Sequence, residues 1–314
     1  MYIINAMVAD VVFYNLDNDE FFSRLLNKVG YKAELVEVSS EVLPDGELVF
    51  NGDFKASKVA VVGGRAWRAR PHIWLNYVAM LSHSLKVRGV SKVVAVMPYL
   101  PYSRQDKVEK GLQPFSAKWV ADLLQVSGID SVLTLSLHSP QIVGFYNIPI
   151  YNLDMQDFVT VLLEKYLLEE ITLVSPDAGM VKTLVKIARG LRQQNIVTIF
   201  KERLSANKIR SVSIHGKLSS KTALIVDDMV ASGGTLTRAA HLLRQHGAEK
   251  VYAFATHPVL TKSIEKIINP KEPVIDQFYF IDTILPQINN PLVSYLDVSA
   301  IIADKLNTIL GTLV

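Results

Sequence analysis

Apolar runs and amphipathic patterns alternate along most of this chain. The run KVAVVGG (Lys58–Gly64) is rich in valine and predicts a strand, and Ile73–Val87 has the spacing of an amphipathic helix. A second strand, Lys92–Tyr102, runs into a proline-rich loop. Ser116–Gly128 follows as a helix with serine at its start and glycine at its end. This alternation predicts βαβ units and a mainly parallel sheet flanked by helices.

The same alternation starts again after Asn152. A helix is expected over residues 155–169, followed by strands and helices in the segments ITLVSPDAG, MVKTLVKIARG, NIVTIF, TALIVDD, TLTRAAHLLRQHG and KVYAFATH. We therefore expect an α/β protein of two similar domains, residues 1–152 and 153–314. Ligands of open α/β sheets bind beyond the carboxyl ends of the strands, so the residues where strands stop are the candidates for a site.

Composition narrows the possible functions a little further. A net charge of +3 on 314 residues is too small to argue for a nucleic-acid partner. The absence of cysteine excludes disulfides, thiolate nucleophiles and cysteine zinc sites, and it fits a cytoplasmic protein. No apolar run approaches the roughly 18–20 residues of a membrane span, and the N-terminus lacks the basic start of a signal peptide. We expect a soluble protein that binds neither nucleic acid nor membrane.

The segment ALIVDDMVASGGTLTRAA joins an apolar strand to a helix. Asp227 and Asp228 close the strand, and their carboxylates suit sugar hydroxyls or a cation bound to them. Gly233 and Gly234 allow close approach of the backbone, and Thr235 opens a helix whose first N–H groups suit a phosphate. Acids on one side and an anion cradle on the other match a ribose 5-phosphate. The alternative is an ordinary turn and helix cap.

Two other phosphate-binding motifs are absent from the sequence. The chain carries neither G-x-x-x-x-G-K-[ST] nor a G-x-G-x-x-G that opens the first βα unit.

These residues also carry a resemblance to a known family. Four apolar positions, two acids, two variable residues, then a small residue, serine, two glycines and threonine resemble the phosphoribosyl diphosphate (PRPP) loop of the type I phosphoribosyltransferase fold. The segment PYLPYSRQDK (Pro98–Lys107) resembles a motif of the ribose-phosphate pyrophosphokinase (PRPP synthetase) family. Further matches run in order between about Leu43 and Asp297: LPDGE, FSAKWVADLL, LHSPQIVGFYNIPIYNL, SPDAG, KER and ATHPVL.

The resemblance implies two type I phosphoribosyltransferase-like domains, with ATP bound by the first and ribose 5-phosphate by the second. The family reaction moves the β,γ-diphosphate of ATP to the 1-hydroxyl of ribose 5-phosphate and gives PRPP and AMP, with Mg²⁺ as cofactor. Such a reaction is catalysed mainly by positioning and by cations. The resemblance also implies a homodimer or a higher homo-oligomer in which the ATP site lies near a subunit interface.

The resemblance assigns a role to each matching residue. The catalytic cations are Lys201 and Arg203, on a loop that closes over the β- and γ-phosphates. The ATP-binding residues are Asp45, Glu47, Arg104, Gln105 and His138. The ribose 5-phosphate residues are Asp227, Asp228, Ser232, Gly233, Gly234 and Thr235. The diphosphate loop is Asp177, Ala178 and Gly179, and the metal ligands are His138 and Asp177.

Taken without the family, these segments have simpler interpretations. PDGE is an ordinary β-turn, and SRQDK reads as a solvated loop. His138 suits a strand-end histidine bonded to backbone, and Lys201 and Arg203 suit an exposed basic hairpin. The KER segment lies between the expected diphosphate and ribose loops, and this position favours a functional role for Lys201 and Arg203.

Three departures from the family pattern stand out. Ser136 replaces an acid two residues before His138, which weakens the case for a metal there. Ala231 replaces another acid, and ASGGT is more like the loop of archaeal-type members. The segment VVGGRAWRARPHIW is unusually basic, and its arginines suit a phosphate; they are Arg65, Arg68 and Arg70.

These departures keep two alternative functions open. One is a catalytically impaired paralogue that binds nucleotides and regulates a true synthetase. The other is a phosphoribosyltransferase that consumes PRPP, although such an enzyme does not account for PYSRQDK.

Overall fold

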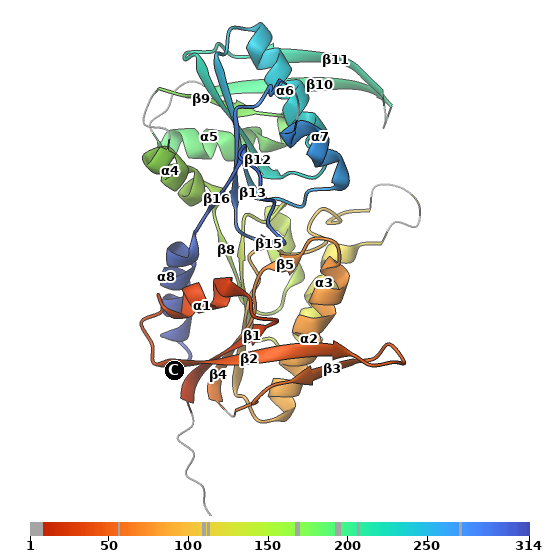
Figure 1. Ribbon diagram of the computed structural model, residues 1–314, viewed down its shortest axis with the longest axis vertical. Helices are drawn as coiled ribbons and strands as arrows, with labels where there is room; N and C mark the ends of the chain where they lie inside the picture. The colour runs from red at the N-terminus through yellow and green to blue at the C-terminus, as the bar shows by residue number, and fades with distance from the viewer. Residues whose placement is uncertain are drawn as a thin grey trace, which may run out of the picture. The chain divides into compact units, whose positions relative to one another are not determined.

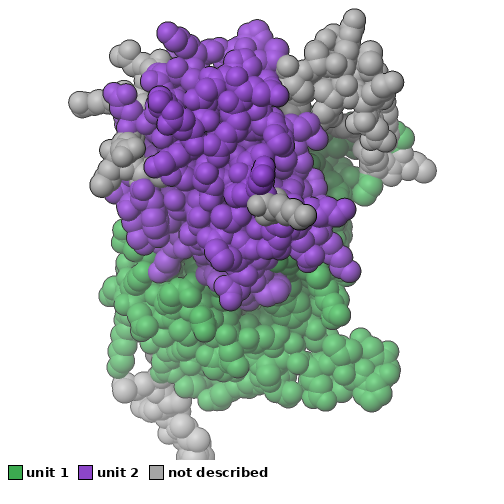
Figure 2. Space-filling view, turned by 45° about the horizontal axis from the view of Figure 1, so that its top comes forward, with its two compact units in different colours: residues 1–153, 298–314 green, residues 154–297 purple. Residues whose placement is uncertain are grey.

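The structure is a computed structural model, and it divides the chain into two compact units (Figure 2). Unit 1 contains Met1–Leu153 and Val298–Val314, and unit 2 contains Asp154–Asp297. The residues described are 9–55, 57–108, 111, 114–166, 170–191, 196–205, 208–269 and 272–314, with the side chains of 9, 201–205 and 208–212 left out. No helix in these ranges is long and apolar enough to cross a membrane.

Unit 1 is built on one sheet, whose strand order within the described residues is β3-β2-β1-β4-β6-β7-β8. The strands are β1 (Ala9–Leu16), β2 (Ala33–Val42), β3 (Leu48–Asn51), β4 (Ser57–Gly63), β6 (Lys92–Val96), β7 (Ser131–Leu135) and β8 (Ile150–Leu153). All pairings are parallel except that of β2 with β3, which form a hairpin. The inner strands β4, β6 and β7 are buried on both faces, which explains why they read as continuous apolar runs.

Helices cover both faces of this sheet (Figure 1). On one face lie α2 (Pro71–Val87) and α3 (Ser116–Val126), and on the other lie α1 (Glu20–Leu26) and α8 (Ser299–Leu310). A 3₁₀ turn, η1 (Pro140–Phe145), packs against α3. The apolar stripes of α2 and α3 complete the core with residues such as Trp74 and Leu124, which are fully buried.

Unit 2 repeats the plan. Its sheet has the order β11-β10-β9-β12-β13-β14-β16 within the described residues, and only β10 and β11 pair antiparallel. The strands are β9 (Thr172–Ser175), β10 (Ile196–Ser205), β11 (Lys208–His215), β12 (Thr222–Met229), β13 (Lys250–His257), β14 (Gln277–Ile281) and β16 (Val293–Leu296). The helices and 3₁₀ turns are α4 (Met155–Tyr166), η2 (Ala178–Met180), α5 (Val181–Gly190), α6 (Gly234–Gln245), η3 (Lys262–Ile264) and α7 (Glu265–Ile268). Two short strands, β5 (Ala66–Trp67) and β15 (Ile284–Leu285), lie outside both large sheets.

The predicted fold class is confirmed: each unit is an α/β layer structure around a mainly parallel sheet. The two sheets match strand for strand, from the antiparallel hairpin at one edge to the last parallel strand at the other. The β2–β3 hairpin, β1 with α1, and the strands β14 and β16 were absent from the sequence interpretation, which followed only the most apolar segments.

The last helix differs from the sequence expectation. The sequence placed all residues from 153 onward in the second domain, whereas α8 packs with α1 inside unit 1. The physical reason is its apolar face: Ile302, Leu306 and Leu310 are buried there, and Asn307 Oδ1 accepts a hydrogen bond from Gly30 N at 2.9 Å. In unit 2 the matching place is taken by α4, which packs on α5. Each of these two helices follows the last strand of the other unit.

Candidate active site

The loop after β12 approaches its surroundings closely at Gly233. This residue has a φ of +73° and stands just before α6. A Cβ atom built on it would lie 2.7 Å from a methyl carbon of Ile264 and 2.7 Å from one of Ile267. The N-cap residue of α6, Gly233, has no side chain, and Gly234 N donates to Ser232 Oγ in a long hydrogen bond of 3.5 Å. The remaining N–H groups of this first turn suit an anion, and their contact with a phosphate stays a prediction.

A neighbouring loop fixes the backbone of this cradle. Val230 N donates to His257 O at 3.0 Å, Leu260 N to Val230 O at 2.9 Å, and Thr261 N to Ala231 O at 2.9 Å. These bonds come from the ATHPVL segment, to which the sequence interpretation gave no role. Ala231 contributes its carbonyl group, so the loop is held here by backbone hydrogen bonds and needs no acidic side chain at this position.

Two carboxylates crowd the end of β12. Asp228 N donates to Asp227 Oδ1 at 2.9 Å, and both side chains are half-buried. Burial, first, and then the charges of Asp228 and Asp177 raise the pKa of Asp227 from 3.8 to about 8. A cation or hydroxyl donors beside this cluster would favour its ionised form. The pair has the chemistry to accept from sugar hydroxyls or to bind a cation, and its contact with ribose 5-phosphate stays a prediction.

The loop predicted to bind the diphosphate lies at the end of the adjacent strand, β9. β9 and β12 run parallel, with Val174 opposite Ile225, so Asp177, just beyond β9, comes near Asp227 at the end of β12. Asp177 also caps η2, because its Oδ1 accepts from Gly179 N at 3.0 Å. Ala178 and Gly179 are exposed. The structure thus supports a local capping role for Asp177 together with its contribution to the acidic cluster.

The described residues do not form a complete set of ligands for the predicted metal ion. Among the described residues, no three histidine or acidic side chains converge well enough to hold a metal ion. Mg²⁺ usually takes only one or two protein carboxylates and keeps water and phosphate ligands. The carboxylates of Asp177, Asp227 and Asp228 lie near one another at the end of β12 and could supply such a partial donor set.

A pocket of about 430 Å³ lies at the strand ends of unit 1. It brings together the loops after β6 and β7, which are far apart in the sequence. Its lining consists of Asp106, Lys107, His138, Ser139 and Gln141. His138 was predicted to bind ATP; the other four were not assigned roles, although they lie within the quoted PYSRQDK and LHSPQIVGF segments.

Arg104 and Gln105 lie just before this lining and are exposed. Gln105 N donates to Tyr102 O at 2.9 Å, and Ala117 N donates to Gln105 O at 3.1 Å, which ties the loop to the start of α3. Tyr102 adopts a φ of +66°. The proline-rich loop is therefore a fixed turn rather than a solvated tail, and its two predicted ATP contacts face water.

Asp45 and Glu47 lie at the tip of the β2–β3 hairpin (Figure 1). Glu47 N donates to Asp45 Oδ1 at 3.0 Å, and Gly46 N donates to Leu43 O at 2.8 Å, as in an ordinary turn. Both acids are exposed, and neither belongs to the lining of the pocket described above. Their predicted contact with ATP stays a prediction.

Lys201 and Arg203 lie on β10, whose backbone pairs antiparallel with β11. Their side chains are outside the described part of the structure. The register shifts between Glu202 and Arg203, which interrupts simple strand alternation. That both cations point the same way stays a prediction.

Comparison with known proteins adds the family. The model for the N-terminal domain of ribose phosphate pyrophosphokinase matches residues 11–128, and that for the phosphoribosyl synthetase-associated domain matches residues 183–312. A ribose-phosphate pyrophosphokinase of Marinomonas sp. (strain MWYL1) is 38% identical over 240 residues, 75% of either chain. This chain belongs to the ribose-phosphate pyrophosphokinase family.

Two further relatives support the same family assignment. The ribose-phosphate pyrophosphokinase of Oceanobacillus iheyensis is 35% identical over 263 residues, which are 83% of this chain and 81% of that one. The crystal structure of phosphoribosylpyrophosphate synthetase from Mycobacterium smegmatis superposes with a TM-score of 0.84 at 25% identity, and covers 96% of this chain and 99% of that chain. The predicted family is thereby confirmed.

The three arginines of the basic loop VVGGRAWRARPHIW have different surroundings in the structure. Arg65 is buried and bound to Asp19, so it is not an open phosphate ligand. Arg70 is exposed and precedes α2. Arg68 is half-buried, and its Nε and Nη2 have no hydrogen-bond partner among the described residues. Ser136, the other departure near His138, is buried with a φ of +41°, and its N–H donates to Leu153 O at 2.9 Å.

Proposed function

We propose that this chain transfers the β,γ-diphosphate of ATP to the 1-hydroxyl of ribose 5-phosphate and releases AMP and PRPP. The observation that carries the proposal is the pocket of unit 1, where the Arg-Gln-Asp segment meets the His138 loop. An enzyme that only consumes PRPP needs the ribose cradle of unit 2 but has no use for this second site. Membership of the pyrophosphokinase family supports the same reaction.

The bond changes follow from the reactants. The 1-hydroxyl oxygen of the sugar attacks the β-phosphorus of ATP. The bond between that phosphorus and the α,β-bridging oxygen breaks, and AMP leaves with the oxygen. The hydroxyl proton is lost to solvent, and neither oxidation nor reduction takes place. Catalysis then consists of aligning two bound substrates and stabilising negative charge on phosphoryl oxygens.

Unit 2 would position the acceptor. Asp227 and Asp228 accept hydrogen bonds from the ribose hydroxyls, and the N–H groups from Gly233 to Thr235 bind the 5-phosphate. Ser232 adds a hydroxyl beside them. Support comes from the left-handed turn at Gly233 and from the acidic cluster at the neighbouring strand ends.

Unit 1 would bind the donor. Arg104 and Gln105 contact ATP from the loop after β6, and His138 does so from the loop after β7. Asp45 and Glu47 reach the adenine of a neighbouring subunit, which makes the active form a homodimer or a larger homo-oligomer. Their exposure at a hairpin tip fits a contact made outside their own unit.

Lys201 and Arg203 would stabilise the transferred diphosphate, and Asp177, Ala178 and Gly179 would cradle it. Asp177 and His138 would each hold Mg²⁺, which neutralises charge on the phosphoryl oxygens when bound. The cysteine-free composition fits work in the cytoplasm.

Product analysis tests this function. The purified protein is incubated with ATP, Mg²⁺ and ribose 5-phosphate, and AMP is measured with and without the sugar. We expect AMP only when ribose 5-phosphate is present. ATP binding without AMP formation would point to an impaired, regulatory paralogue. Pyrophosphate released from PRPP and a nucleobase would point to a phosphoribosyltransferase. Either of these two results would overturn the proposal.

A further inference from the structure

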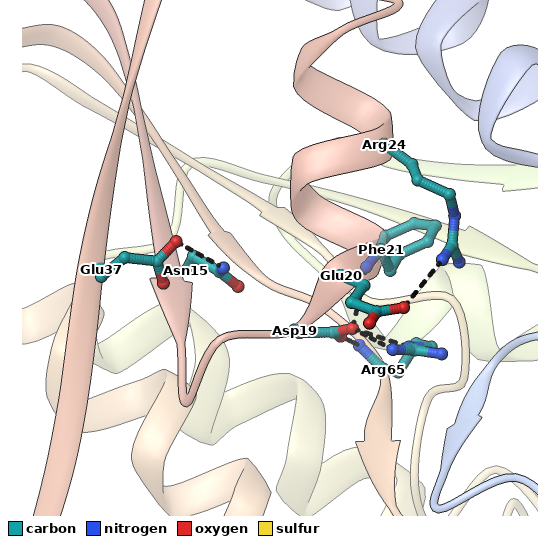
Figure 3. A network of polar contacts seen from close by, with 7 residues as sticks. All are labelled: Asn15, Asp19, Glu20, Phe21, Arg24, Glu37 and Arg65. Atoms are coloured by element: carbon teal, nitrogen blue, oxygen red, sulfur yellow. Dashed lines mark hydrogen bonds and ion pairs between the residues drawn. The ribbon is translucent and has the colours of Figure 1, made fainter.

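A buried ion pair joins two loops of unit 1 (Figure 3). Asp19 Oδ1 lies 2.7 Å from Arg65 Nε and 2.5 Å from its Nη2, and Asp19 Oδ2 accepts from Arg65 N at 2.8 Å. Asp19 also caps α1, since its Oδ1 accepts from Phe21 N at 3.0 Å. The two side chains are only 5% and 6% exposed. The loop after β1 and the loop after β4 are therefore tied together by three polar contacts.

The backbone at the end of β4 is closely packed at Gly63 and Gly64. Gly64 has a φ of +105°, and a Cβ atom there would lie 2.9 Å from Asp19 Oδ2. On the other side, Gly64 N donates to Val96 O at 2.8 Å. A Cβ atom on Gly63, whose φ is +113°, would lie 2.3 Å from that same oxygen. The loop after β4 is thus held between Asp19 and the end of β6.

The end of β6 leads directly into residues 97–107, which carry Arg104, Gln105 and part of the pocket lining. We call this segment the nucleotide loop. Val96 is its last residue, and Met97 N donates to Leu133 O at 2.8 Å on β7. Leu135 N donates to Pro98 O at 3.3 Å. Arg104 and the pocket lining follow a few residues later. A change in the loop after β4 is therefore transmitted to the start of the nucleotide loop through Val96.

Equivalent strand ends in the two units carry different charged side chains. β1 and β4 take the sheet positions in unit 1 that β9 and β12 take in unit 2. In unit 2 the two carboxylates near these strand ends belong to Asp177, just beyond β9, and Asp227, near the end of β12, and their like charges oppose each other. In unit 1 the loops after β1 and β4 carry Asp19 and Arg65, which neutralise each other. The strand-end site that is acidic in unit 2 is closed by an internal cation in unit 1.

We propose that Asp19 and Arg65 are a positioning pair for the nucleotide loop of unit 1. The pair itself does not contact the substrate. It holds the loop after β4 against Val96, and in this way it determines the positions of Arg104 and Gln105 relative to bound ATP. This inference rests on the proposed function of unit 1 as the ATP-binding half. It assigns Arg65 a structural partner within the unit, not a phosphate.

The test compares Asp19→Asn, Arg65→Gln and the double variant by steady-state kinetics. We expect each single variant to raise the KM for ATP about tenfold, since small misplacements of binding groups are costly, with the KM for ribose 5-phosphate changed by less than about twofold. The double variant is expected to be little worse than either single one, because the residues act together. Arg65→Lys keeps the charge but loses the paired geometry, and is expected to lie in between.

A matched control lies one residue away. Glu20 is exposed and forms a long ion pair, at 3.8 Å, with the half-buried Arg24 of the same helix, so Glu20→Gln is expected to leave both KM values unchanged (Figure 3). A lower melting temperature with both KM values unchanged would overturn the proposal, as would a loss of ATP affinity in Arg65→Gln but not in Asp19→Asn. The latter result would mean that Arg65 itself binds phosphate.

A second readout covers variants that fold poorly and separates this inference from the function. Calorimetry with Mg²⁺ and adenosine 5′-(β,γ-imido)triphosphate measures nucleotide affinity without turnover, and Arg65→Lys is the mildest change to use. A wild-type chain that releases no AMP would contradict the proposed function, whereas equal nucleotide affinity in wild type and Arg65→Lys would contradict the positioning pair.

Discussion

At the scale of single residues, Asp227 determines how the ribose site responds to pH. Its pKa is raised from 3.8 to about 8 by burial and by the neighbouring carboxylates. A carboxyl whose pKa is higher in the folded chain binds more protons when folded. Its contribution to stability is therefore full below pH 4 or so and declines as the pH rises towards its folded pKa. Sugar hydroxyls donating to the ionised form work against that decline.

We predict that affinity for ribose 5-phosphate rises between pH 7 and 9 by as much as about tenfold. Asp227 changes from mostly protonated to mostly ionised over this range, while the sugar phosphate, with a second pKa of about 6, stays fully charged. Calorimetry at each pH measures the effect. Asp227→Asn cannot titrate and is expected to show a flat profile, so an equal slope in wild type and variant would exclude Asp227 as the titrating group.

Lys201 is predicted to act on turnover rather than on sugar binding. A cation that meets the diphosphate as charge develops stabilises the transition state, and removal of one such group costs about 10²–10³ in kcat. We expect this loss in Lys201→Ala, with ribose 5-phosphate affinity changed by less than about threefold. Lys217→Ala, an exposed lysine beyond the β10–β11 hairpin, is the control. A collapse of sugar binding in Lys201→Ala would assign the residue to the ribose site instead.

The residue scale also shows where sequence reasoning succeeds. Asp177, Asp227 and Asp228 follow strands in an α/β pattern, and the ends of neighbouring parallel strands must lie together, so their proximity was predictable. The Asp19–Arg65 pair was not, because the two residues are separated by 46 positions and neither lies in a periodic pattern. The sequence indicated a basic loop open to phosphate; the fold neutralises its first arginine internally.

At the scale of elements, the turn before α6 depends on the absence of a side chain at Gly233. Gly233→Ala adds a Cβ atom 2.7 Å from Ile264 and Ile267 in a left-handed backbone, so the turn has to shift. We predict at least about a tenfold loss of ribose 5-phosphate affinity, measured by calorimetry, since the phosphate-binding N–H groups lie in this turn.

The matched control is Gly247→Ala, just beyond the other end of α6. Gly247 also has a positive φ, of +96°, but a Cβ atom there meets nothing within 4 Å. This variant carries the backbone strain without the clash, and we expect it to lose a little stability and no sugar affinity. Equal losses of affinity in both variants would mean that general destabilisation, not the geometry of the cradle, is responsible.

The C-terminal helix α8 is predicted to stabilise unit 1. Leu306 is fully buried, so Leu306→Ala is expected to cost about 2–5 kcal/mol of unfolding free energy. Hydrogen exchange locates the effect: amides of β1 and α1 should exchange faster, and those of β12 and β13 should not. Asp304→Ala, on the exposed side of the same helix, is the control. Faster exchange in β12 and β13 alone would contradict the assignment of α8 to unit 1.

The sequence could not assign α8 to its unit. The segment after Asp297 reads as an amphipathic helix, but its pattern shows only that one face is buried, and not against which sheet. Chain order suggested the nearer domain, whereas packing gives the helix to unit 1. The β2–β3 hairpin was overlooked for a related reason: its burial is partial, so it lacks the apolar run that identifies an inner strand.

At the scale of the whole molecule, the chain uses one fold plan twice and specialises each copy at its strand ends. Unit 2 keeps an acidic cluster and a glycine turn that suit a sugar phosphate. Unit 1 closes the matching place with its own ion pair and forms its pocket one and two strands further along, after β6 and β7. The duplication was visible in the sequence because both halves repeat the same strand and helix order. The different use of the equivalent loops required the structure.

The central claim is that the diphosphate of ATP moves to the sugar as one unit. The most direct measurement follows ATP labelled at its β-phosphorus through a reaction with ribose 5-phosphate and Mg²⁺, with products separated and counted. We predict that the label appears in PRPP, with one unlabelled AMP for each PRPP formed. Label retained in ADP, with only the γ-phosphate on the sugar, or no transfer while ATP stays bound, would contradict the account.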